Sequence, residues 1–298
     1  MSDRDDLATR FETQRPHLRA VAYRMLGSLD EAEDVVQDAW LRASRADTKK
    51  VENLAGWLTT VVARLSLDRL RTRRSRREEP IDLAVPDPIL SSAAEVDPEE
   101  EALLADSVGL AMLIVLETLS PAERLAFVLH DTFGLPFEQI APMLGRTPTA
   151  TRQLASRGRR RVRGATASAE VPLRRQWELV DAFLAASRNG DIGALVRVLD
   201  PDVLVRADAG AGTTPLGRTR GIRGAAAVAQ QAMAFRHLAP GARRVLVNGG
   251  AGFVVFAGGR PYAVVGFGFN ASSITEIDFL LDPDRLARLD LSVAGTAR

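Results

Sequence analysis

Apolar residues recur at helical spacing along the first half of the chain. They predict a first helix over Phe11–Leu26, and Ser28 with Glu31 forms a capping box that predicts a second helix over LDEAEDVVQDAWLRAS. A third apolar stripe predicts a long helix over residues 53–77, helices resume at Glu99, and a further capping box opens a helix over 120–133. This part of the chain is therefore expected to be all-α.

Residues 135–163, LPFEQIAPMLGRTPTATRQLASRGRRRVR, predict two short helices joined by a tight turn. Gly145 suits a helix C-terminus that requires positive φ, Thr147 offers a hydroxyl N-cap, and Pro148 fits the first helical position. Leu154 and Val162 share one face of the second helix. The opposite face carries Thr149, Arg152, Ser156, Arg159, Arg160 and Arg163. The pattern favours a helix-turn-helix that places polar side chains in a DNA major groove; the alternative is a helical hairpin with solvated arginines.

The predicted secondary structure changes from all-α to mixed helices and strands after a connector of small residues at 164–172. Two helices are expected over 173–188 and 192–199, another within GIRGAAAVAQQAMAFRHL, and a last one in DPDRLARLD. Strands are expected at 203–206, 243–248, 252–256, 262–269 and 273–281, with glycine pairs at two hairpin turns. Two helices, a strand, a helix and an antiparallel meander predict an α+β cone with a curved antiparallel sheet and an internal pocket.

The amino-acid composition restricts the kinds of functional site that the protein can form. The 298 residues include no cysteine, which excludes disulfides, thiolate metal sites and cysteine nucleophiles, and the three histidines lie far apart. We therefore expect neither a metal nor a cofactor. An acidic, polar N-terminus and the lack of a membrane-length apolar run predict a cytoplasmic protein without membrane attachment.

The net charge of +1 conceals a strong segregation of charge along the chain. Basic residues crowd into 64–77 and 157–163, whereas acidic residues concentrate at 30–38 and 95–101. Basic faces suit nucleic acid, and an acidic helix suits a basic protein partner. Trp57 beside the first basic run could stack an unpaired base; the alternative is a core tryptophan. The prolines at 80, 86, 88 and 98 predict a linker without helical periodicity.

Three stretches carry a family resemblance: SLDEAEDVVQDAWLR, LAGWLTTVVARLSLDRLR and LSPAERLAFVLHDTFGLPFEQIAPMLGRTPTATRQLASRGRRR. In this order they resemble a sigma-70 family transcription initiation factor of the extracytoplasmic-function (ECF) group, in the SigJ-type branch that carries a fused C-terminal SnoaL-like domain. The resemblance implies a sigma region 2 domain over 1–78, a linker over 79–98 and a sigma region 4 domain over 99–165. A connector over 166–172 and a SnoaL-like regulatory domain over 173–298 would follow.

The resemblance also implies partners and site residues. RNA polymerase core would be held through its β′ clamp helices and β flap, the clamp helices contacting Asp30, Asp34, Gln37, Asp38 and Trp40. The −10 element of promoter DNA would be bound and melted by Trp57, Arg64, Arg69, Arg71, Arg73 and Arg74. The −35 element would be read by Thr149, Arg152, Gln153 and Ser156, with phosphate contacts from Arg157, Arg159 and Arg160.

Regulatory motifs of the branch match less completely. The linker reads Ala84-Val85-Pro86-Asp87-Pro88, which lacks the branch's tryptophan. Asp208-Ala209-Gly210-Ala211-Gly212 is a degraded form of a glycine-rich motif, and Asp282-Pro283-Asp284-Arg285-Leu286 matches a terminal motif well. The resemblance therefore implies regulatory roles for Pro86, Asp87, Pro88, Asp208, Gly210, Asp282, Pro283 and Asp284, with no separate anti-sigma factor required. The alternative is plain turn and cap chemistry.

Two other functions stay open for the cone. SnoaL-like domains include cyclases and isomerases that use a pocket carboxylate, for which Asp208, Glu276 and Asp278 are candidates. No carboxylate–histidine constellation accompanies them, so we expect the protein not to be an enzyme. The other alternative is a sensor that binds a small apolar ligand among Phe183, Phe253, Phe256, Phe267 and Phe269, although such aromatic residues are often plain core.

Overall fold

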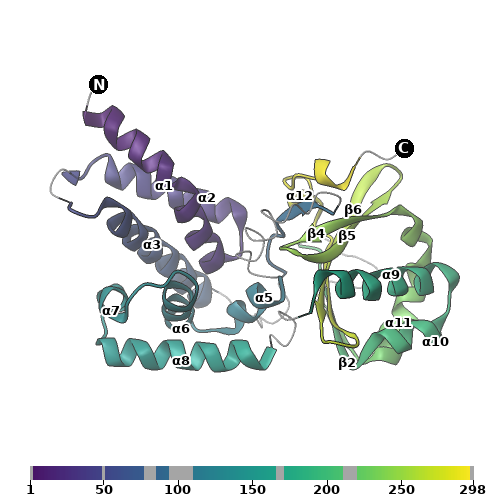
Figure 1. The fold of residues 1–298 in the computed structure, drawn as a ribbon. Helices are drawn as coiled ribbons and strands as arrows, with labels where there is room; N and C mark the ends of the chain where they lie inside the picture. Colours follow the sequence, from purple (N-terminus) through teal and green to yellow (C-terminus); the bar gives the residue numbers. More distant parts are fainter. Residues whose placement is uncertain are drawn as a thin grey trace. The chain divides into compact units, whose positions relative to one another are not determined.

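The computed structural model describes residues 3–48, 51–76, 85–93, 110–165, 171–210 and 220–295. Its contacts divide the chain into two compact units, one of residues 1–80 and 115–164, the other of residues 81–114 and 165–298. Figure 1 shows that the first unit is helical and that the second is built around a sheet. The predicted order of all-α domains followed by an α+β domain is therefore confirmed.

The first unit begins with three helices, α1 (Asp3–Leu26), α2 (Leu29–Ala43) and α3 (Leu54–Arg76), which pack on one another. Helix α1 starts earlier than its apolar stripe predicts, because polar residues precede the buried Phe11 on the same helix. The side chain of Ser28 accepts a hydrogen bond from the backbone N–H of Glu31, so the predicted N-cap of α2 is confirmed.

Five further segments follow along the chain: α5 (Leu110–Thr118), whose residues 110–114 belong to the second unit, α6 (Pro121–Phe127), the π-helical turn η2 (Val128–Thr132), α7 (Phe137–Leu144) and α8 (Pro148–Ala165). The Ser120–Glu123 capping box is formed in both directions. The single helix predicted over 120–133 instead changes to wide i→i+5 turns, with Phe133 N–H bonded to Val128 O. Apolar spacing does not distinguish one wide turn from an α-helical turn. The predicted start at Glu99 lies outside the described residues.

A buried arginine joins the two groups of helices in this unit. Arg124 is 2% exposed; its Nε donates to Arg24 O at 3.3 Å and its Nη2 to Glu117 Oε1 at 2.9 Å. The Arg24 guanidinium in turn lies 4.8 Å from the centre of the Phe133 ring. A buried charge with these partners fixes how α6 meets the end of α1, because losing a partner would leave the charge uncompensated.

The second unit contains a mixed sheet and short helices. The strands are β1 (Leu90–Ser92), β2 (Leu199–Asp208), β3 (Arg220–Arg223), β4 (Ala242–Val247), β5 (Gly250–Ala257), β6 (Arg260–Phe269) and β7 (Ile274–Leu280). Their order in the sheet is β1-β4-β5-β6-β7-β2-β3. The helices are α9 (Leu173–Asn189), α10 (Ile192–Val198), α11 (Ala225–Ala234), the 3₁₀ segment η4 (Arg236–Gly241), α12 (Pro283–Leu286) and the 3₁₀ turn η5 (Ser292–Ala294).

Two details of the predicted cone are wrong. The sheet is not wholly antiparallel, since β7 lies parallel to β2 with Asp278 opposite Arg206. Residues 220–223, expected in part within a helix, form β3 on β2, and the helix begins only after Gly224, whose φ is 98°. The meander that ends in β7 brings that strand beside β2, and such non-local pairing is invisible to local patterns.

The described part of the predicted linker also belongs to this unit. Its strand β1 pairs antiparallel with β4, with Leu90 opposite Val247, and the N–H of Ile89 donates to Asn248 Oδ1 at 3.1 Å. The linker thus ends in an edge strand of the sheet, directly after its prolines, rather than in a free connection. Pro86 and Pro88 precede β1, so neither removes a donor from its pairing with β4.

The sheet has two covered faces. Inward side chains such as Val205, Phe253 and Ile277 form the main core of the unit with residues of α9, α10 and α11. Figure 1 shows these helices on one side of the sheet. The opposite face carries a smaller core in which Val85 of the linker and Leu286 of α12 lie on strand residues. Strand alternation therefore decides which side chains face the inside of the cone and which face the linker.

Candidate functional site

The helix-turn-helix forms as its residues predict. Helix α7 ends at Gly145 in the left-handed region with φ 62°, and Thr147 Oγ1 accepts a hydrogen bond from Ala150 N–H at 3.2 Å at the start of α8. Leu154 and Val162 are buried, which confirms the inner face of α8. Gly158 lies against α6, where an added Cβ would come within 3.1 Å of Phe127 Cβ.

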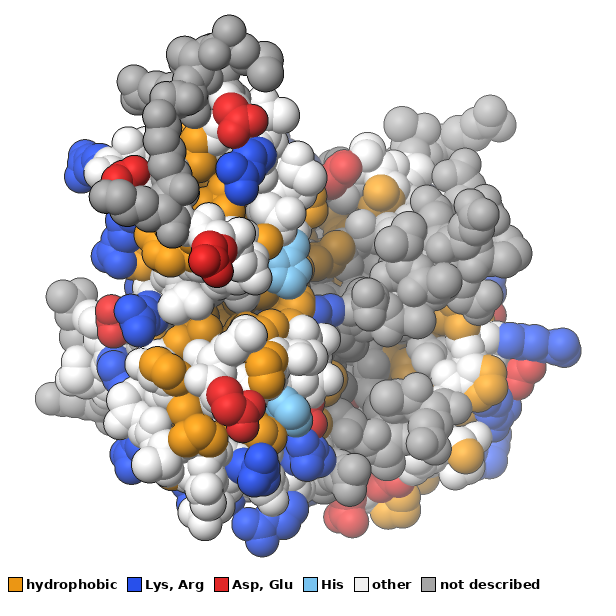
Figure 2. Space-filling view, turned by 60° about the vertical axis from the view of Figure 1, so that its left-hand side comes forward, with side chains coloured by type: hydrophobic (Ala, Val, Ile, Leu, Met, Phe, Trp, Pro, Cys, Tyr) orange, Lys and Arg blue, Asp and Glu red, His pale blue; other side chains and the backbone are white. Residues whose placement is uncertain are grey.

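The outer face of α8 presents polar side chains near its N-terminus. Thr149, Arg152, Gln153 and Ser156 are all exposed. The Arg152 guanidinium lies 5.3 Å from the Phe137 ring centre, so α7 supports it from one side while its donors stay available. Figure 2 shows Lys and Arg side chains gathered along the lower edge of the helical unit, at the height where Figure 1 draws α8.

The later arginines of α8 differ in their surroundings. Arg157 Nε donates to Glu123 Oε1 at 3.0 Å, and Arg159 Nε donates to Asp131 Oδ1 at 2.7 Å. Burial works against the charge of Glu123, but hydrogen bonds from Ser120 and Arg157 outweigh it and lower the pKa of that carboxyl. Arg160 is exposed and makes no ion pair within the described ranges.

The acidic and basic residues expected to serve two partners meet between α2 and α3. Arg69 donates to Asp34 Oδ2 at 3.3 Å and to Asp38 Oδ2 at 3.2 Å. Arg73 donates to Glu31 Oε1 at 3.2 Å and to Leu26 O at 3.0 Å. These two arginines therefore fasten α3 to α2, a role that the charge pattern alone did not predict.

Other predicted residues of this domain stay on the surface. Asp30, Gln37, Arg64, Arg71 and Arg74 are exposed. Trp40 is half-buried with its ring 5.1 Å from that of Phe11, so it lies at the border of the core. Trp57 is also half-buried, which fits neither a wholly buried core residue nor a fully exposed stacking platform.

A second cluster joins the linker to the cone through Asp208. Its Oδ2 accepts hydrogen bonds from Val85 N–H at 3.2 Å and from Arg285 Nη1 at 2.9 Å, and its Oδ1 accepts from Gly210 N–H at 3.0 Å. Arg285 Nε donates to Asp87 Oδ1 at 2.6 Å, and its Nη2 donates to Val85 O at 2.6 Å. We call these residues (Val85, Asp87, Asp208, Gly210, Asp282 and Arg285) the linker clamp.

The degraded glycine motif keeps the glycine that the clamp requires. Gly210 has φ 60°, and an added Cβ would lie 2.0 Å from Asp282 Oδ2. Asp282 is meanwhile the N-cap of α12 and accepts from the N–H groups of Asp284 and Arg285. The N-cap thus holds the backbone of Arg285, whose side chain reaches Asp208.

Arg285 belongs to the linker clamp but is not among the regulatory residues expected from the sequence. It is half-buried and makes hydrogen bonds to the linker and to β2 that a lysine could not reproduce in the same fork. The signal was present in the sequence, because Arg285 occupies the basic position of the terminal motif. Ala84, which replaces the branch's tryptophan, lies outside the described residues.

The candidate catalytic carboxylates lie on the linker side of the sheet. Arg206 holds Glu276 and Asp278, with Nη1 2.8 Å from Asp278 Oδ1 and Nη2 3.0 Å from Glu276 Oε1. Burial raises the pKa of Asp278 to about 7, although Arg206 acts in the opposite direction. Neighbouring Ile277 and Phe279 face the cone interior instead. These carboxylates are thus separated from the interior by the sheet.

Within the described ranges, no group of three or more acidic or histidine side chains could hold a metal ion. No helix there combines the length and hydropathy needed to cross a membrane. The arrangement as a whole defines a class of protein: an arginine-rich three-helix domain followed in the chain by a helix-turn-helix with an exposed polar face, fused to an α+β cone.

Comparisons with known proteins narrow this class. The "Sigma-70 region 2" model matches residues 11–76, and the "Sigma-70, region 4" model matches residues 111–162. The chain is 35% identical over 298 residues to "Probable ECF RNA polymerase sigma factor SigI" of Mycobacterium tuberculosis, covering 99% of this chain and 100% of that protein. It is 38% identical over 273 residues to the ECF sigma factor SigJ of the same organism, covering 90% of this chain and 86% of that protein.

A solved structure matches across both units. The crystal structure of M. tuberculosis SigJ aligns with a TM-score of 0.73 and 32% identity, over 95% of this chain and 99% of that chain. The chain therefore belongs to the ECF group of the sigma-70 family and carries the C-terminal SnoaL-like domain predicted from its sequence.

Proposed function

We propose that this protein binds RNA polymerase core in the cytoplasm and directs it to promoters with −10 and −35 elements. The observation that carries the proposal is the outer face of α8, where four exposed polar residues precede arginines suited to phosphates. Thr149, Arg152, Gln153 and Ser156 would read base edges, because the N-terminal part of a recognition helix lies deepest in the major groove.

The acidic face of α2 would contact the polymerase clamp helices, and the exposed arginines of α3 would hold the −10 backbone. Asp34 and Asp38 both accept hydrogen bonds from Arg69. This arginine would therefore orient the two carboxylates toward a basic partner, in addition to any contact with DNA. Arg64, Arg71 and Arg74 are better suited to phosphates, because they are exposed. Asp30, Gln37 and Trp40 complete the proposed polymerase surface, and Trp57 the −10 surface.

Binding of core polymerase tests the acidic face directly. We expect Asp34→Ala to weaken the affinity of the full chain for core polymerase about tenfold, since an interfacial charge would be lost. Glu12→Ala, which removes an exposed carboxylate of α1 paired with Arg15, is the charge-matched control and should change the affinity little. Equal effects of the two substitutions would contradict the proposed polymerase surface.

We further propose that the cone restrains the linker and thereby modulates activity without a separate anti-sigma factor. The linker clamp supports this, because Asp208 and Arg285 hold Val85 and Asp87 by three hydrogen bonds and are joined to each other by a fourth. The −10 and −35 elements lie about 25 base pairs apart, or ~85 Å along B-DNA. The α1–α3 helices and α6 touch at Arg124, so engaging both elements would require that contact to open.

We propose no enzymatic role for the cone. Asp208 belongs to the linker clamp, while Glu276 and Asp278 bind Arg206 on the same side of the sheet. A base must reach its substrate within hydrogen-bond distance, and these groups face the linker rather than the interior.

A further inference from the structure

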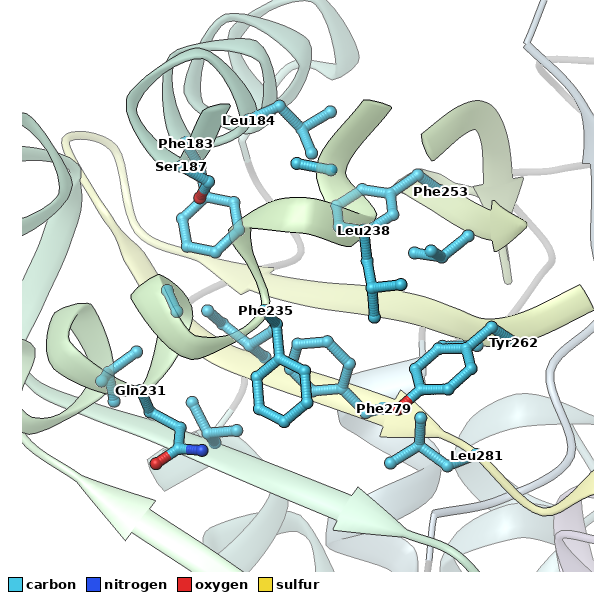
Figure 3. A pocket seen from close by; sticks show the side chains of 17 residues that line it. Phe183, Leu184, Ser187, Gln231, Phe235, Leu238, Phe253, Tyr262, Phe279 and Leu281 are labelled. Carbon is cyan, nitrogen blue, oxygen red and sulfur yellow. The ribbon is translucent and has the colours of Figure 1, made fainter. Parts of the chain in front are cut away.

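The cone encloses a cavity between its helices and the inner face of the sheet. Its volume is about 100 Å³, and Figure 3 shows the side chains that line it. The deep part is formed by buried residues of α9 and the strands, including Phe183, Phe253, Val255 and Ile277. Half-buried residues such as Phe235 of α11's C-terminus and Tyr262 of β6 mark the part that meets solvent.

The lining is uncharged and almost wholly apolar. Its 17 side chains include no Asp, Glu, His, Lys or Arg; the polar ones are Ser187, Gln231 and Tyr262. Gln231 and Tyr262 are half-buried, whereas Ser187 is only 5% exposed. An ionised ligand would lose its hydration here without gaining a counter-charge, so the lining selects for a neutral molecule.

Ser187 supplies the second, independent observation. Its Oγ is shielded from solvent and makes no hydrogen bond to any part of the chain that the structure describes. A buried hydroxyl without a partner is costly, and native proteins satisfy most such groups. A trapped water would need two to four polar partners, which the surrounding phenylalanine and leucine side chains do not provide.

The volume of the cavity further restricts which molecules can bind in it. An apolar cavity of about 150 Å³ lined by similar residues is known to accept benzene, so about 100 Å³ with an opening beside Tyr262 suits a single ring. We propose that the cone binds a small neutral one-ring molecule whose single polar oxygen hydrogen-bonds to Ser187 Oγ. The ligand is bound and not converted, because Glu276 and Asp278 lie beyond the sheet.

This inference extends the proposed function without resting on it, since binding is measured without polymerase or DNA. The probes are phenol and toluene, which share a ring and differ by one hydroxyl. Binding to the full chain is followed by titration calorimetry. Ser187→Ala should weaken phenol about tenfold, as expected for losing a buried hydrogen bond, and leave toluene within about twofold.

A cavity-filling pair of variants tests the location. Ala232→Phe, on the cavity side of α11, should abolish binding of both probes, whereas Ala226→Phe, on the exposed side of the same helix, should preserve both. The far-ultraviolet circular dichroism of each variant checks the fold. If Ala232→Phe does not fold, the phenol-to-toluene ratio in Ser187→Ala decides alone.

Three results would overturn the inference. The first is no binding of either probe to the wild-type chain at millimolar concentration. The second is an equal loss of phenol and toluene affinity in Ser187→Ala, and the third is an equal effect of Ala226→Phe and a folded Ala232→Phe. None of these results would bear on promoter-directed transcription, which is tested by separate measurements.

Discussion

Replacing Gly210 with alanine should destabilise the linker clamp. The effect should be larger than that of the same replacement at another glycine with a similar positive φ. Gly210 has φ 60°, and a side chain in this left-handed region costs about 1 kcal/mol. The new Cβ would also lie 2.0 Å from Asp282 Oδ2. Moving Asp282 would remove the N-cap of α12, which adds about 1 kcal/mol. We therefore expect a total destabilisation of about 2 kcal/mol.

Gly258→Ala is the matched control. Gly258 has φ 57° but no heavy atom within 4 Å of its added Cβ, so only the conformational cost of about 1 kcal/mol applies. Hydrogen exchange of the full chain, read at the amides of Val85 and of Arg285, reports the opening free energy of the clamp. Faster exchange at these amides in Gly210→Ala alone supports the account. Equal exchange in the two variants would refute the steric reasoning.

Three further predictions concern charge. Arg285→Ala should release the linker and increase proteolytic cleavage near residues 85–89, whereas Arg260→Ala, at the exposed start of β6, should not; equal cleavage would contradict the clamp. Because the folded-state pKa of Asp278 is about 7, the folded protein holds a proton that the unfolded chain releases above about pH 4, so stability should fall as pH rises from about 4 to 7. Urea unfolding of Asp278→Asn between pH 5 and 8 should lose that part of the slope, and an unchanged slope would place the titration elsewhere. Arg152→Ala should weaken promoter binding in a way that depends on the −35 sequence, whereas Arg160→Ala should weaken it uniformly; equal losses on every promoter, measured by fluorescence anisotropy, would mean that α8 is placed wrongly in the groove.

Local patterns predicted much of the helical unit. Thr147 and Pro148 mark the start of α8, and Gly145 the end of α7, because caps and turns depend on residues within a few positions. Leu154 and Val162 face inward for the same reason, since helical spacing alone decides the face.

Long-range pairing was beyond the same patterns. Arg285 and Val85 are 200 positions apart in the chain, so neither residue indicates the other. The parallel pairing of β7 with β2 likewise joins distant segments and brings Arg206 to Asp278. Alternation on β7 does separate Asp278 from Ile277, but the sequence does not say which face of the strand lines the cavity. By sequence alone, Glu276 and Asp278 are therefore candidate bases.

The charge segregation was informative in part. It located α2 and α3 as surfaces of opposite charge, yet Arg69 and Arg73 are engaged by α2 in the structure. The charge pattern alone does not show that basic residues of α3 bind acidic residues of α2.

Run-off transcription with core polymerase tests the central claim most directly. The template is a library with randomised −35 and −10 elements, transcribed by core polymerase alone, with the full chain, or with its Arg152→Ala variant. The account predicts that the full chain produces transcripts from a restricted set of templates and that Arg152→Ala changes the −35 sequences in that set. Transcripts no more abundant or selective than those of core polymerase alone would contradict it.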